Sequence, residues 1–182
     1  METQKILVYR REVKHPRIEL KTGDVVLILP KNNSLNADLL IEKHNLWIDK
    51  KLRFISEIKE KFKDKKLINK KDDTFITTTV DLIDKYCHKL KKWPRVIKFR
   101  YMKTKWGSCS KIGRISLNKL LKFIPNNLIA YVVYHELCHL IVPKHNSNFW
   151  LLVEKEFPLY KDNEQALFGY WFLLSERLNN RK

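Results

Sequence analysis

The stretch that most constrains this chain is VVYHELCHLIVPKHNSNFW, residues 132–150, which places three histidines and a glutamate in an otherwise apolar segment. His135 and His139 are four residues apart, so on a helix their side chains lie on one face, one turn above the other. Two imidazoles placed in this way can reach a single zinc ion at about 2.0–2.1 Å each. Glu136 is rotated by about 100° from His135, so it suits a general base better than a ligand.

The residues around these polar groups are uncharged, which predicts that the helix is buried. They are Val132, Val133, Leu137, Cys138, Leu140 and Ile141. Two histidines and a carboxylate within one turn are costly to bury unless they share a metal ion. A helix that is merely rich in histidine is the alternative, and the burial cost makes it the weaker interpretation.

A catalytic zinc site normally has three protein ligands and one open position, and His145 is the candidate for the third ligand. Pro143 is expected to end the helix at Val142, so that the chain turns back toward the metal. The histidine spacing equals that of the H-E-x-x-H-x-x-G-x-x-H metzincins, but Val142 stands at the glycine position, which argues against a true metzincin. The alternative third ligand is a carboxylate from a later helix: Glu164 first, then Glu154 and Glu156.

Hydrophobic periodicity predicts one α+β domain over residues 1–182, with an N-terminal β/helical part at 1–73 and a catalytic part at 74–182. N-terminal antiparallel strands, long helices, a small β-sheet and the H-E-x-x-H helix are its expected components. The expected strands are residues 5–10, 17–21, 25–30, 93–102 and 113–118, and the expected helices are 36–66, 78–92, 124–142 and 163–178.

The segment KWGSCS is expected to form a turn between two strands. Trp106, Gly107 and Ser108 either support the core or contact substrate, because an extended peptide can add to a sheet edge at this segment or at GRISLN. Phe149 and Trp150 are expected to pack under the metal site. The candidates for stabilising an oxyanion are Arg100, Lys105 and Tyr131.

Composition narrows the class of protein further. The formal net charge is +17, which suggests a polyanionic partner such as nucleic acid. Lysine dominates arginine and is widely spread, so a lysine-favouring genome composition is the competing explanation. The three cysteines have no C-x-x-C spacing, which indicates a reducing compartment and predicts a cytoplasmic protein. No apolar run approaches the length of a membrane span, and the first residues do not form a signal peptide.

Three segments together resemble the YgjP-like metallopeptidases, also described as the DUF45 or WLM-related group and placed near the M48 and SprT-like proteases. They are RYMKTKWGSCS, GRISLNKLLKFIP and YVVYHELCHLIVPKHNSNFW. The resemblance extends over residues 6–167. One departure is KLINKKDDTF, which is shorter than the hairpin that the family commonly has before its second helix.

The resemblance implies a zincin-like fold and a zinc-dependent metallopeptidase that holds one zinc ion per chain. It assigns His135, His139 and His145 as ligands and Glu136 as the general base. The expected partner is a peptide or protein substrate, with no membrane. By analogy with the SprT-like relatives, a protease of DNA-linked proteins or a metal-binding, nucleic-acid-associated protein is the alternative. A purely structural zinc domain is disfavoured, because it has no use for Glu136.

Overall fold

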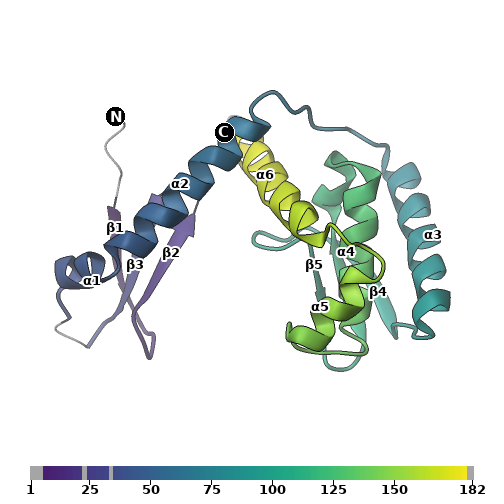
Figure 1. Cartoon of the computed structure of the whole chain (residues 1–182), viewed down its shortest axis with the longest axis horizontal. Helices are drawn as coiled ribbons and strands as arrows, with labels where there is room; N and C mark the ends of the chain where they lie inside the picture. The colour runs from purple at the N-terminus through teal and green to yellow at the C-terminus, as the bar shows by residue number, and fades with distance from the viewer. Residues whose placement is uncertain (1–5, 22–23, 33–34, 180–182) are drawn as a thin grey trace. The chain divides into compact units, whose positions relative to one another are not determined.

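The computed structural model describes residues 6–21, 24–32 and 35–179, and it confirms a mixed α+β architecture (Figure 1). The chain divides into two compact units, which are residues 1–64 with 171–182, and residues 65–170. The expectation of a single domain with parts at 1–73 and 74–182 stays a prediction. In the described part of the chain, no helix combines the length and the apolar character needed to cross a membrane.

The first unit is built on a three-stranded sheet of β1 (Ile6–Arg11), β2 (Arg17–Lys21) and β3 (Asp24–Pro30), in the order β1-β3-β2. All three expected strands are present, and β2 and β3 form the expected antiparallel pair. The expectation of antiparallel strands was wrong for β1, which pairs with β3 in parallel. The physical reason is burial: β3 is apolar on both faces, so it takes the centre of the sheet and separates β1 from β2.

Two helices follow in this unit, α1 (Ala37–Lys43) and α2 (Asn45–Phe62). The sequence predicted one continuous helix here, but His44 adopts non-helical dihedral angles and divides it. Asn36 caps α1 by accepting a hydrogen bond from the Asp38 N–H. Helix α2 buries one apolar stripe, formed by Ile48, Ile55, Ile58 and Phe62.

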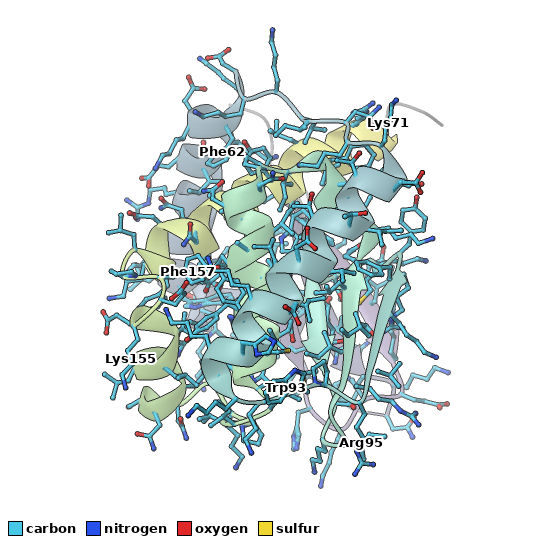
Figure 2. The ribbon with its side chains drawn as sticks, turned by 90° about the vertical axis from the view of Figure 1, so that its right-hand side faces the viewer. Phe62, Lys71, Trp93, Arg95, Lys155 and Phe157 are labelled. Atoms are coloured by element: carbon cyan, nitrogen blue, oxygen red, sulfur yellow. The ribbon has the colours of Figure 1, made fainter. Side chains whose placement is uncertain are left out.

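The second unit contains α3 (Asp72–Leu90) and α4 (Asn126–Cys138), which lie side by side (Figure 1). Helix α3 begins six residues earlier than expected, because Asp72 and Asp73 belong to its first turn, where carboxylates are favourable. Figure 2 shows α3 running between Lys71, which precedes it, and Trp93, which follows it. Two more helices complete the described chain, α5 (Ser147–Glu154) and α6 (Tyr160–Asn179).

A second small sheet consists of β4 (Val96–Arg100), β5 (Gly107–Cys109) and β6 (Arg114–Asn118), in the order β4-β6-β5. The segment expected as a turn therefore contains an edge strand, which pairs antiparallel with β6. Because side chains alternate along a strand, this sheet has an inner and an outer face. The inner face carries Ile97, Phe99, Ile115, Leu117, Gly107 and Cys109, and it packs on α3 and α4.

Helix α4 lies in the interior, and ten of its thirteen residues are buried. It ends at Cys138, four residues before the predicted end at Val142. The chain leaves the helix through tighter turns, in which the Leu140 and Ile141 N–H groups bond to carbonyls three residues earlier. Pro143 follows this turn rather than terminating the helix itself.

Candidate metal centre

The three histidines of the motif converge at the end of α4. Their possible ligand atoms all lie within 4.8 Å of one another, and the Nε2 atoms of His135 and His145 are 3.0 Å apart. Nitrogen ligands of a tetrahedral zinc ion lie about 3.4 Å apart, given Zn–N bonds of about 2.0–2.1 Å. The spacing of these nitrogens therefore suits a metal ion, although His145 comes from the loop after the helix.

The turn after α4 fixes the ring of His139. Its Nδ1 lies 3.2 Å from the carbonyl oxygen of Val142, and a carbonyl only accepts, so Nδ1 donates the hydrogen. This bond leaves Nε2 of His139 unprotonated and free to bind a metal. Val142, at the position of the metzincin glycine, thus contributes through its backbone.

An aromatic layer from α5 supports the histidines. Phe149 is fully buried and stacks on His139, with ring centroids 4.5 Å apart. Trp150 stacks on His145 at 5.6 Å. Asn146 caps α5 by accepting from the Phe149 N–H, which sets the start of this helix directly after the third histidine. The expected packing of Phe149 and Trp150 under the site is confirmed.

Glu136 lies against the edge strand β5. A Cβ atom at Gly107 would stand 2.6 Å from both Cγ and Oε1 of Glu136, so only glycine leaves room for this carboxylate. Glu136 is only 6% exposed, and its burial raises its pKa to about 8. The positive charge of Lys105 and a hydrogen bond from the Cys109 backbone act against that rise. Gly107 therefore leaves the space beside the strand that the buried carboxyl group of Glu136 occupies.

The other ring nitrogen of His135 faces away from the histidine cluster. Its Nδ1 is buried and has no hydrogen-bond partner among the described residues. The nearest acidic group is Oε1 of Glu164 on α6, at 3.9 Å, and this carboxylate accepts a hydrogen bond from the Tyr131 hydroxyl. Burial, followed by the charge of Glu164, raises the pKa of Tyr131, so its hydroxyl stays protonated as a donor.

Burial also affects the histidines. It lowers the pKa of His135 to about 3, and repulsion from His139 and His145 adds to this shift. The pKa of His139 is lowered as well, chiefly by burial. Neutral imidazole is the form that binds metal ions, so both shifts favour binding at neutral pH.

The other residues that the sequence suggested for substrate binding, oxyanion stabilisation or metal binding lie away from the three histidines or have other partners. The Trp106 indole donates to the Leu167 carbonyl on α6, and Ser108 lies opposite Ser116 on the outer face of the sheet, away from Glu136. Arg100 also belongs to that outer face. Of the alternative ligands, Glu156 pairs with Lys89, and Glu154 is exposed.

Sequence reasoning missed Asn118, which is fully buried at the end of β6. Its amide donates to the carbonyls of Met102 and Lys105, and its side-chain oxygen accepts from the backbone N–H groups of Met102 and Leu120. These bonds hold the loop that leads into β5. An asparagine in an apolar strand was the available signal, because a buried amide needs partners.

Comparison with known proteins adds a family match to this geometry. The model of the YgjP-like metallopeptidase domain matches residues 75–169, slightly more than half of the chain. The match contains the motif and the second sheet, and it leaves out the N-terminal residues to which the sequence resemblance also extends.

Several solved structures are similar to this chain, and two of them are metallopeptidase zymogens. The metallopeptidase zymogen of Pyrococcus abyssi abylysin is 28% identical, with a TM-score of 0.47, and the match covers 50% of this chain and 93% of that one. The metallopeptidase zymogen of Methanocaldococcus jannaschii jannalysin is 25% identical, with a TM-score of 0.42, and the match covers 54% of this chain and 88% of that one. No curated protein matches the chain.

Proposed function

The chain belongs to the YgjP-like metallopeptidase family, and from this premise we propose that it is a zinc-dependent peptide hydrolase with Glu136 as its general base. The observation that carries the proposal is the convergence of three histidine nitrogens within 4.8 Å, one residue from a buried carboxyl group. His135, His139 and His145 would hold one zinc ion per chain. A peptide or protein is the substrate of a peptidase.

The donor set favours zinc. Three neutral imidazoles with an open fourth position are typical of catalytic zinc. No further side chain of the described residues joins the three histidines in this cluster, which argues against a closed structural site. When bound, zinc lowers the pKa of water and polarises the substrate carbonyl.

Side-chain and backbone groups of the chain would transfer the proton and bind the substrate. Glu136 takes a proton from the attacking water and passes it to the leaving amine. Burial raises the pKa of this carboxyl group in the metal-free chain, and the positive charge of a bound zinc ion would favour the carboxylate that accepts the proton. The edge strand β5, which borders Glu136, offers backbone groups to an extended peptide.

Glu164 fits a positioning residue better than a third ligand. It lies on the Nδ1 side of His135, whereas Nε2 of that ring faces His145. The distance of 3.9 Å is too long for a hydrogen bond, but the side chain is half-exposed and can approach by rotation. A carboxylate that accepts from Nδ1–H would fix the ring and make Nε2 a better ligand.

The proposal is tested by metal content and peptide hydrolysis of the full chain. We expect about one zinc ion per purified chain, its loss in His145→Ala, and its retention in His88→Ala, an exposed control on α3. Glu136→Gln should keep zinc and lose about 10²–10⁴-fold in hydrolysis of an unfolded protein such as casein. Full activity of Glu136→Gln, or a parent protein that does not bind added zinc, would refute the proposal.

A further inference from the structure

The positive charge of the chain is concentrated in one stretch. Residues 85–135 contain thirteen lysines and arginines and no aspartate or glutamate, whereas the other 131 residues contain 24 basic and 20 acidic side chains. A lysine-favouring genome composition raises lysine throughout a chain, but it does not remove acidic residues from 51 consecutive positions. The asymmetry therefore calls for an explanation in this part of the structure.

The second sheet presents part of this charge on its outer face. Ile97 and Phe99 of β4 point inward, so Lys98 and Arg100 point outward. Arg114, at the start of β6, stands opposite Val96 and shares this orientation. Lys98, Arg100 and Arg114 are all exposed and are called here the basic face.

Nothing acidic neutralises the basic face within the described residues. The ion pairs that lysines of this stretch form join Lys89 to Glu156 and Lys122 to Asp72. Lys89 lies on α3, and Lys122 lies on a short 3-10 helix, Lys119–Phe123, that follows β6, so neither belongs to the sheet. Three cations without acidic partners on one small sheet form a surface that attracts a polyanion.

An exposed aromatic ring stands at the end of this surface. Tyr101 follows Arg100 directly and is 67% exposed. The Nζ atom of Lys119 lies 5.7 Å from the centroid of its ring. Arg100 and Asn118 are the last paired residues of β4 and β6, so the ring and this lysine lie at the end of the sheet where Arg100 stands. An exposed ring beside cations is the arrangement on which nucleic-acid bases stack.

We propose that the outer face of the second sheet is a nucleic-acid-binding surface, on which Lys98, Arg100 and Arg114 contact phosphates and Tyr101 stacks on a base. An acidic polypeptide would use the cations but would gain nothing comparable from the ring. The surface lies on the opposite side of the sheet from α4 and Glu136, so binding there does not depend on the proposed peptidase chemistry.

The test measures binding of fluorescently labelled 20-nucleotide single-stranded DNA and RNA, and of the matching DNA duplex, by anisotropy at 50 and 200 mM salt. The full chain is compared with the triple variant Lys98→Gln, Arg100→Gln, Arg114→Gln. The control is Lys50→Gln, Lys51→Gln, Arg53→Gln, which removes three exposed charges from α2. Circular dichroism checks that both variants fold.

The basic-face variant should bind single strands at least tenfold more weakly at 50 mM salt, and the control should change affinity less than twofold. Losing three phosphate contacts should also reduce the magnitude of the salt slope by about 2, at about 0.7 per contact. Tyr101→Ala should weaken binding of single strands more than binding of the duplex.

Three results would overturn the inference. Equal losses in the basic-face and control variants would mean that net charge alone attracts nucleic acid. Unchanged binding by the basic-face variant would place the contact elsewhere. Tighter binding of poly-glutamate than of any oligonucleotide, lost in the same variant, would make the partner an acidic polypeptide.

Discussion

The carboxylate of Glu164 lies 3.9 Å from Nδ1 of His135, on the side of the imidazole ring that faces away from His145. The sequence offered Glu164 as an alternative metal ligand. Its position instead suits a partner that orients a ligand, because a histidine that binds through Nε2 needs an acceptor at Nδ1. The hydroxyl group of Tyr131, a residue of α4, donates a hydrogen bond to the same carboxylate.

Glu164→Gln should therefore weaken zinc binding by about 10–100-fold without abolishing it. The affinity is measured by competition with a chromophoric chelator, which requires no substrate. Glu154→Gln, an exposed change at the end of α5, serves as the control and should bind zinc like the parent. If Glu164→Gln lost zinc as completely as His145→Ala, the carboxylate would have to be counted as a ligand.

Gly107→Ala should reduce turnover while zinc remains bound. The added Cβ would overlap Glu136 at 2.6 Å, so the carboxyl group proposed as the general base must move from its place beside β5. We expect a loss of at least tenfold in kcat, since misplacement of a catalytic group by about 1 Å can cost 10²-fold. Ser116→Ala, a small change on the neighbouring strand, should leave kcat within twofold. An unchanged kcat in Gly107→Ala would show that Glu136 does not need its present position.

The contribution of Glu136 to the stability of the metal-free protein should fall as the pH rises from about 4.5 to 8. Burial raises the pKa of Glu136 from 4.5 to about 8, so in this window the group is protonated when folded and ionised when unfolded. Unfolding then releases a proton, and the free energy of unfolding falls with rising pH.

Glu136→Gln removes this titration and should be more stable than the parent at pH 8, by about 1.4 kcal/mol for each pKa unit of the shift. Below pH 6.5 the lowered pKa of His135 makes the free energy of unfolding rise with pH, which opposes the effect of Glu136. Both proteins contain His135, so this contribution cancels when the two are compared. Urea unfolding in the presence of a chelator at pH 5 and pH 8 measures the difference. Equal pH dependence of the two proteins would contradict the buried, protonated carboxyl group.

Asn118→Ala should destabilise the chain by about 2–6 kcal/mol. Two carbonyl groups, those of Met102 and Lys105, lose their donor, and each buried group left without a partner costs about 1–3 kcal/mol. The midpoint of urea unfolding reports the loss. Asn127→Ala, an exposed change on α4, should shift the midpoint little. Similar midpoints for both variants would mean that the loop before β5 does not depend on Asn118.

Much of the local structure followed from the sequence. The three N-terminal strands, β4, β6 and most of α4 lie where alternation and helical periodicity place them. Local sequence patterns predicted the ends of the helices and the edge strand of the second sheet less well. The short strand β5 contains a glycine and no alternating apolar run, so only its pairing with β6 identifies it.

The sequence by itself determined the histidines and the glutamate of the motif, because a spacing of four residues on a helix sets their relative positions before any tertiary contact forms. The tertiary structure decided what surrounds them. Gly107 meets Glu136, Glu164 approaches His135, and the three cations of the basic face share one side of a sheet. Strand pairing and helix packing bring these residues together from distant parts of the chain. No local pattern encodes such contacts, and for that reason the roles proposed for them arise from the fold.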